Sequence, residues 1–335
     1  MNWLKSGLTM ALLCLLGGIQ AKAQIQIHHT GNVKGSLPHA ALPVSIVINP
    51  TYGFVAIGKT AQLSATGTYA DATTADVTNQ VTWSSSNPNL ATVSSSGLAS
   101  GIAAGRVTIT ASFAGGPSKA ATLTIGANGY IYQSEPYAWT DISTTGASIF
   151  TIPTYGLDDD CKAVTPGGAT PLNFIFYGNS YSTFYVSTNG AIIFGGSSTA
   201  FSNYAIPNVR APNNFIAVQF ADLHLTKNKG QVYWKLQGTA PTRSLIIQWN
   251  DIDHLYYQTG FITFQAELYE GTNQIVMRYK DVVFGGISSD GGLLDYGQGA
   301  TVGLENSTGS AGCMYSYNQK ALSDGQAIRF IYQTQ

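Results

Sequence analysis

The chain has 335 residues, with 16 lysines and arginines against 17 aspartates and glutamates, so its formal net charge is −1 at pH 7. It contains no basic patch and no charge run, which gives no support to nucleic-acid binding or to electrostatic attachment to a membrane. Charged residues make up only 10% of the chain, so a soluble surface must rest on neutral hydrogen-bonding groups, as in many exported β-proteins.

Residues Met1 to Ala23 have the pattern of a cleavable secretory signal. Lys5 supplies the basic start, and the apolar run from Leu8 to Ile19 is too short to span a bilayer comfortably. Ala21-Lys22-Ala23 fits the rule of small residues before the cleavage point, which puts the mature start at Gln24. We therefore expect a secreted or cell-surface protein with no transmembrane segment in its mature chain.

Alternating apolar and polar residues predict β-strands between residues 81 and 111. Val81-Thr82-Trp83 alternates, and so does Val107-Thr108-Ile109, so each strand has one apolar face. Asn87-Pro88-Asn89 and Gly97 are turn signals between them. This pattern places Trp83 on the buried face.

These residues also carry a resemblance to a known family. The stretches Val81 to Val93, Gly97-Leu98 and Gly105 to Ala111 resemble the group 2 bacterial immunoglobulin (Ig)-like domain, over about Val44 to Ile125. Such modules recur in secreted and surface proteins of bacteria, often as spacers that carry another domain outward. The resemblance implies an Ig-like β-sandwich.

The rest of the chain shows many strand signals and no convincing helical period. Asn189-Gly190 predicts a tight hairpin, since both residues tolerate positive φ, and Glu270-Gly271-Thr272-Asn273 predicts a second hairpin loop. Short strands without helices predict a large antiparallel β-sandwich or jelly roll. Strands are expected at 173–177, 184–186, 191–194, 215–220, 231–236, 244–249, 261–269, 274–279, 300–304 and 327–332.

The predicted fold class is therefore all-β throughout. The expected organisation is a signal peptide at 1–23, a flexible lead-in at 24–43, an Ig-like domain at 44–126, a hinge at 126–129 and a β-sandwich binding domain at 130–335.

The second domain is loosely similar to the nidogen-type extracellular domain and its bacterial relatives. The stretches that carry the similarity include Phe176 to Tyr181, Val186 to Gly190, Pro212 to Ala217 and Leu268 to Asn273. In the family an aspartate pair follows the isoleucine-alanine stretch, and here only the second aspartate, Asp222, is present. The resemblance implies surface or matrix attachment and supplies no catalytic residues.

Asp158-Asp159-Asp160 is the densest group of charges and a candidate calcium site. Calcium binds several oxygens that converge from a loop, and an exported domain meets millimolar calcium. However, consecutive residues of an extended chain point to opposite sides. The alternative is a solvated acidic turn before Cys161.

Asp251 and Asp253 form a second candidate metal site together with His254. Two residues apart on a strand, the two aspartates would share one face. Asp222-Leu223-His224 has the same alternation, and two such edges meeting across a sheet could form an oxygen–nitrogen metal site. The alternative is a set of strand-end carboxylates bonded to backbone amides. Calcium is the cofactor considered for either site, and at the second site His254 would make zinc or another transition metal a competitor.

Five tyrosines in loop-like sequence are candidate ligand-binding residues. Sugars are recognised by exposed aromatic faces rimmed by polar side chains, because sugar C–H faces are apolar and hydroxyls are not. The alternative is packing at the core or at a sheet edge. The five are Tyr256, Tyr257, Tyr296, Tyr315 and Tyr317.

Cys161 and Cys313 are expected to form a disulfide after export. The bridge would close a loop of about 150 residues and stabilise the fold by at most roughly 5 kcal/mol. The alternative is two separate buried thiols.

No motif of a metalloprotease or of a serine hydrolase occurs in the sequence. We expect a non-enzymatic adhesion or binding protein, in which an Ig-like spacer presents a β-sandwich to a cell-surface or matrix component such as a polysaccharide. The alternatives are an extracellular hydrolase with its site in the loops of the second domain, and a structural part of an extracellular assembly.

Overall fold

The computed structural model describes residues 42–334 apart from 127, 228, 255–259 and 286–293, and it confirms the predicted all-β class. Within these residues the one helical element is the short 3₁₀ turn η1 (Asp295–Gly297). No helix in the described part is long and apolar enough to cross a membrane. The predicted signal peptide and most of the lead-in lie outside the described residues.

Residues 45–126 form an Ig-like β-sandwich of three small sheets, ordered β2-β10-β9-β6, β1-β4-β5 and β3-β8-β7. Burial alternates along β9 as the sequence pattern predicts, with Val107, Ile109 and Ala111 inside. The strands are β1 (Ser45–Asn49), β2 (Tyr52–Ala56), β3 (Thr60–Gln62), β4 (Ser64–Thr68), β5 (Thr74–Asp76), β6 (Thr82–Ser85), β7 (Ala91–Val93), β8 (Leu98–Gly101), β9 (Gly105–Ser112) and β10 (Ser118–Gly126).

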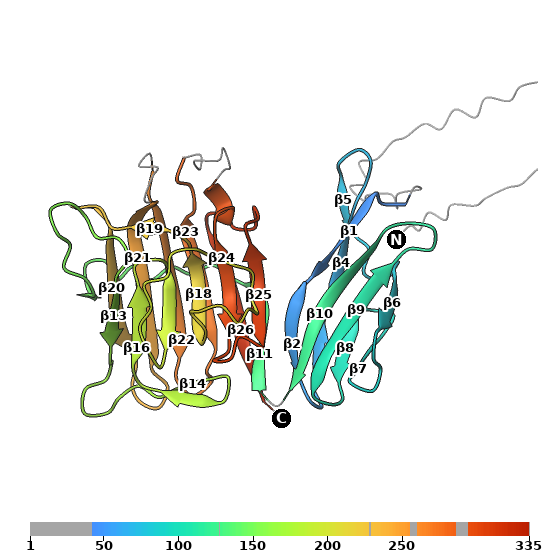
Figure 1. Ribbon diagram of the computed structural model, residues 1–335, viewed down its shortest axis with the longest axis horizontal. Coiled ribbons are helices and arrows are strands. Elements are labelled where there is room, and N and C mark those ends of the chain that lie inside the picture. The colour runs from blue at the N-terminus through green and yellow to red at the C-terminus, as the bar shows by residue number, and fades with distance from the viewer. Residues whose placement is uncertain (1–41, 127, 228, 255–259, 286–293, 335) are drawn as a thin grey trace, which may run out of the picture. The chain divides into compact units, whose positions relative to one another are not determined.

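Residues 128–334 form a larger sandwich, drawn from green to red in Figure 1. One sheet has the order β11-β26-β23-β22-β21-β20-β12, with β19 paired to β21, and the other has the order β13-β16-β17-β18-β24-β25. The strands of the first are β11 (Asn128–Glu135), β12 (Ala147–Ser148), β19 (Leu223–His224), β20 (Gln231–Gln237), β21 (Ser244–His254), β22 (Ile262–Tyr269), β23 (Ile275–Asp281) and β26 (Gln326–Thr334). Those of the second are β13 (Cys161–Val164), β16 (Phe184–Ser187), β17 (Ala191–Phe194), β18 (Phe215–Phe220), β24 (Thr301–Glu305) and β25 (Gly312–Tyr317), and β14 (Phe174–Phe176) pairs with β15 (Asn179–Tyr181).

Both large sheets contribute side chains to one continuous core, which includes Phe184 and Val218 from one sheet and Trp249 and Phe264 from the other. Polar tips of aromatic residues also link the sheets. The Trp249 indole donates to the carbonyl of Ser187 over 3.0 Å, and the Tyr279 hydroxyl donates to the carbonyl of Val218 over 2.6 Å. The core thus fixes how the two sheets face each other.

Strand residues flank position 127 on both sides in the predicted hinge at 126–129. Gly126 ends β10, where it lies opposite Ala56, and Asn128 begins β11, where it lies opposite Thr334. Ladder pairing occupies Gly126, Asn128 and Gly129, so the small size of these three residues does not mark a loop. The independence of the two domains stays a prediction.

The predicted disulfide is also wrong. Cys161 and Cys313 are free thiols on β13 and β25, the two edge strands of one sheet, with four strands between them. At about 4.8 Å per strand spacing the cysteines lie about 24 Å apart, whereas a disulfide needs Cα atoms within about 7 Å.

Replacing Trp83 tests the core of the Ig-like domain. Its side chain is 8% exposed, and its indole donates to the carbonyl of Thr78 over 2.9 Å. We expect Trp83→Ala to lower the free energy of unfolding by about 3–5 kcal/mol. Trp83→Phe should lose about 1 kcal/mol for the hydrogen bond plus a smaller packing loss. Urea denaturation of the Ig-like domain measures both, and a loss below about 1 kcal/mol for the alanine variant would place the ring outside the core.

Candidate metal centre

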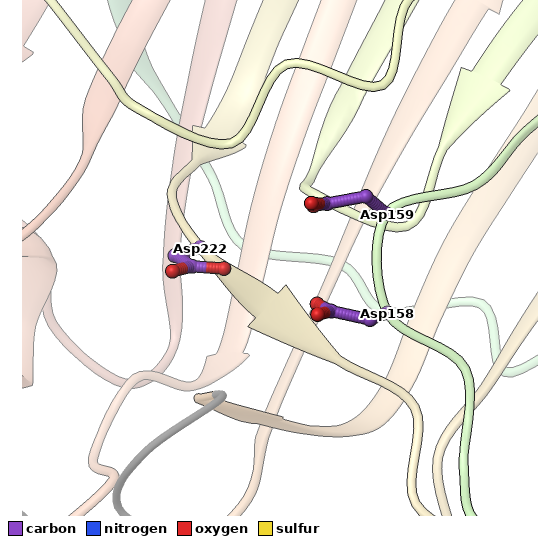
Figure 2. A group of neighbouring side chains, drawn as sticks. All are labelled: Asp158, Asp159 and Asp222. Atoms are coloured by element: carbon purple, nitrogen blue, oxygen red, sulfur yellow. The ribbon is translucent and has the colours of Figure 1, made fainter.

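Three aspartates from two segments of the larger sandwich lie together. Asp158, Asp159 and Asp222 each offer a carboxylate oxygen, and these oxygens lie within 4.8 Å of one another. Figure 2 shows Asp158 and Asp159 pointing toward Asp222, which precedes β19. The sequence prediction had placed Asp222 in a separate candidate site, so the structure brings together members of both.

The chain bends at Asp159, and this bend is why two adjacent carboxylates converge. In an extended strand they would point to opposite sides. The third residue of the run does not join them. Asp160 accepts a hydrogen bond from the Cys161 amide at 2.7 Å and pairs with the Lys162 ammonium at 3.0 Å. The triple-aspartate site is therefore corrected to two of its three members.

The tight turn between β16 and β17 holds both acidic segments in place. The hydroxyl of Thr188 donates to the carbonyl of Asp158 over 2.7 Å. The buried amide of Asn189 donates to the Asp159 carboxylate over 2.7 Å and accepts from the Leu223 backbone amide over 2.8 Å. The sequence predicted this hairpin from its Asn-Gly signal, but not its role as the support of the site.

Gly190 allows that turn to approach the neighbouring strand. Its φ is +72°, which favours glycine, and a Cβ there would lie 2.2 Å from the carbonyl oxygen of Gln219. A side chain at this position would push the turn, and with it Asn189, away from the acidic segments.

The electrostatics of the three carboxylates favour a cation. Asp158 and Asp222 each have one buried oxygen (Oδ1) without a hydrogen-bond partner in the described part of the chain. Burial, together with the charges of Asp158 and Asp159, raises the pKa of Asp222 from 3.8 to about 6. Burial and the charge of Asp159 also raise the pKa of Asp158. A bound cation would satisfy these oxygens and remove the repulsion between the carboxylates.

The donor atoms of this group indicate which cation fits. All three are carboxylate oxygens, which suit calcium and magnesium, whereas zinc sites are built with histidine and cysteine ligands. Asp159 is exposed, so the group opens to solvent. Calcium tolerates irregular geometry and takes additional oxygens from water, so it fits this open group better than magnesium does.

The second predicted metal site forms only in part. The two predicted segments do pair with each other: His224 lies opposite Asp253, and Leu223 lies opposite His254. However, Asp251 has a φ of +52° and sits at a β-bulge, so it is exposed while Asp253 is fully buried. The predicted shared face of Asp251 and Asp253 is therefore wrong, because the extra residue of a bulge shifts the alternation.

Further titratable groups, most of them partly buried, lie beside the aspartates. The pairing of Leu157 with Leu225 brings Asp158 beside His224, which in turn lies opposite Asp253. Burial raises the pKa of Asp253, and the hydrogen bond from the His254 backbone amide partly opposes this. Burial lowers the pKa of His254. Asp253 and His254 thus adjoin the site without being among its converging ligands.

Three of the five predicted tyrosines are described, and they lie on η1 and β25. Tyr256 and Tyr257 lie outside the described residues. Tyr296 and Tyr315 pack partly buried against the main core, and the Tyr315 hydroxyl donates to the carbonyl of Ala321. Tyr317 is partly exposed on β25. A ligand-binding role for these five stays a prediction.

We expect calcium to raise the melting temperature of the protein. A ligand that binds only the folded state stabilises it by about 2.7 kcal/mol at a hundred times its Kd, or about 5–10 °C for a domain of this size. Asp222→Asn and Asp159→Asn should each abolish the shift, measured by differential scanning calorimetry. Asp160→Asn is the matched control and should keep it, and a shift that survives the first two substitutions would move the site elsewhere.

The calcium effect should also disappear in mild acid. Asp222 must be ionised to bind a cation, and its pKa is raised to about 6, so apparent affinity should fall about tenfold per pH unit below about 6. In the cation-free protein, by contrast, stability should fall as pH rises. The pKa of Asp222 is higher in the folded state than in the unfolded state, so ionisation of this group lowers the free energy of unfolding between about pH 4 and about pH 6. Calorimetry at pH 5, 6 and 7.5 checks both, and the account fails if Asp222→Asn shows the same pH dependence as the unaltered chain.

The comparisons with known proteins agree with both predicted resemblances. Residues 44–125 match the bacterial Ig-like domain (group 2), and residues 129–333 match the family described as NIDO related. Ice-binding protein 1 of Shewanella frigidimarina (strain NCIMB 400) is 54% identical over 68 residues, which are 20% of this chain and 8% of that protein. The matched families and relative are of non-catalytic types. Because residues 129–333 are more than half of the chain, it belongs to the NIDO-related family and carries a group 2 bacterial Ig-like domain ahead of that region.

Proposed function

We propose that this chain is an exported, non-enzymatic binding protein whose larger sandwich attaches to a glycan at a cell surface or in a matrix. The Ig-like domain serves as the spacer that presents it. The succession of the two matched modules supports an extracellular binding role. The short match to Ice-binding protein 1 covers too little of that protein to carry its named activity to this chain.

An exposed aromatic side chain, Tyr155, is the reason to propose a glycan as the ligand. Tyr155 is 85% exposed and lies three residues before Asp158. An exposed ring stacks on the apolar face of a sugar, and neighbouring carboxylates, or a calcium ion that they hold, bind its hydroxyls. Ring and carboxylates together form the combination that sugar recognition needs.

The position of Tyr155 is set by the turn that contains it. The amide of Gly156 donates to the carbonyl of Pro153 over 3.1 Å, which closes the turn. Gly156 has a φ of +90°, and a Cβ there would lie 2.5 Å from the His224 imidazole. The backbone of the turn therefore packs directly on the strand that follows Asp222, and this supports a position of Tyr155 near the acidic group.

The same carboxylates offer a second candidate function, a glycoside hydrolase. Asp222, with a pKa of about 6, would act as the acid, and Asp159 would be the second carboxyl group of the pair. The two functions separate by product: a hydrolase releases reducing ends from a polysaccharide, whereas a binding protein retains the glycan intact. We favour binding, because the matched families are of non-catalytic types.

Glycan-array binding of the full chain tests this proposal. We expect the calcium-dependent share of binding to fall about tenfold, or about 1.4 kcal/mol, for Tyr155→Ala and for Asp159→Asn. Tyr155→Phe keeps the ring and should bind nearly as well, while Asp160→Asn is the control beside the site. Unchanged glycan binding by Tyr155→Ala would contradict the role proposed for this ring. Release of reducing ends from a polysaccharide would favour the hydrolase.

A further inference from the structure

A connection without strands, residues 136–146, runs across the outer face of one large sheet. It leaves β11, at one edge of that sheet, and leads to β12, at the other edge. Between the two edges, the Lys280 ammonium on β23 lies over the Trp139 ring, 5.8 Å from its centre. The Lys235 ammonium on β20 donates to the Thr145 hydroxyl over 3.1 Å. We call residues 136–146 the strap.

Few contacts hold the strap on the sheet. Most of its side chains are exposed, and among its residues, all of them described, Ile142 is the one that is buried. The Ile142 amide donates to Gln248 Oε1 over 3.0 Å, and Gln248 Nε2 donates to the Asp141 carboxylate over 3.0 Å. Gln248 is therefore the main polar anchor of the strap. A segment with few buried apolar contacts opens more readily than the core beneath it.

The sheet face under the strap is polar. Gln248 on β21, Gln265 on β22 and Arg278 on β23 lie opposite one another in the ladder, so their side chains share this face. All three are buried. Since amide and guanidinium groups hydrogen-bond well to water, exposing this row costs less than exposing apolar side chains of the same size.

Several polar atoms at this contact have no partner while the strap is closed. Neither Nε2 nor Oε1 of Gln265 forms a hydrogen bond with any described residue, and the same holds for the Trp139 indole nitrogen and for Arg278 Nε. A buried polar atom without a partner destabilises the state that buries it. Water reaches these atoms once the strap lifts. The closed arrangement therefore carries a cost that the open arrangement does not.

We propose that the strap is a lid that lifts from the sheet while the strands beneath it stay paired. Its two ends allow this motion, because β11 pairs with β26 and β12 pairs with β20 through ladders that do not include the strap. Lifting breaks the two bonds at Gln248 and exposes Gln265 and Arg278 to water. The inference goes beyond the proposed function and needs neither a glycan nor a cation.

Hydrogen exchange of the full chain, followed by NMR, tests the lid. The reporters are the Ile142 amide and the Trp139 indole N–H, both covered in the closed arrangement. We expect both to exchange at least about a hundredfold faster than the ladder amides of β21 and β22, after correction for intrinsic rates. Urea below the unfolding transition should speed the strand amides and leave the reporters unchanged, because a local opening exposes little new surface.

Two leucine substitutions should shift the opening in opposite directions. Gln248→Leu removes both bonds between this residue and the strap, so the Trp139 indole N–H should exchange about tenfold faster. Gln265→Leu removes two unpaired polar atoms and adds an apolar side chain that opening would expose, so the same N–H should exchange about tenfold slower. Gln319→Leu, at an exposed loop position, is the matched control and should change the rate by less than about twofold.

Two results would overturn the lid. One is strap reporters that exchange as slowly as the strand amides and respond to urea in the same way. The other is faster exchange in Gln265→Leu, because water bound at Gln265 would then be holding the strap closed. A variant that unfolds as a whole loses protection in the strand amides as well, and in that case the urea dependence of the unaltered chain decides.

Discussion

The larger sandwich depends on a hydrogen bond that crosses its core. The buried Trp249 indole, stacked on Phe264 at 5.1 Å, donates to the carbonyl of Ser187 on the opposite sheet. An indole N–H buried in a core must find an acceptor, so this bond fixes the end of β16 against β21. The next two residues, Thr188 and Asn189, then hold the carbonyl of Asp158 and the carboxylate of Asp159. Core packing and the acidic site are thus parts of one continuous arrangement.

The same arrangement holds the carboxylates of Asp158, Asp159 and Asp222 close together. Repulsion between them destabilises the fold unless another group compensates their charge. Asn189 supplies one donor to Asp159, but buried oxygens of Asp158 and Asp222 lack partners in the described residues. One buried acid of this domain, Glu270, is compensated by an arginine. Glu270 receives two hydrogen bonds from Arg243, and its pKa is lowered to about 2. The contrast is the physical argument for the proposals that the aspartate group holds a cation and that the exposed ring of Tyr155 binds a sugar near it.

Local signals in the sequence predicted the strands and turns well, because they depend on alternation and on turn chemistry. Trp83 is buried as its alternation predicts, and the Asn189-Gly190 turn lies where its dipeptide predicts. The site was predicted only in pieces, since its assembly needs a bend at Asp159 and a long-range approach of Asp222. Asp251 and Asp253 lie on a strand, as predicted, but a bulge at Asp251, where φ is positive, breaks the alternation of faces on which the prediction depended. Such features arise from tertiary packing, which sequence spacing does not report.

The central claim is that Asp158, Asp159 and Asp222 hold a calcium ion. Anomalous diffraction from crystals of the full chain grown in millimolar calcium tests it most directly. The account predicts an anomalous peak bonded to oxygens of all three carboxylates at about 2.3–2.6 Å, with water filling the remaining positions. It would be contradicted by the absence of a peak there at neutral pH, with the carboxylates bonded instead to donors of the protein.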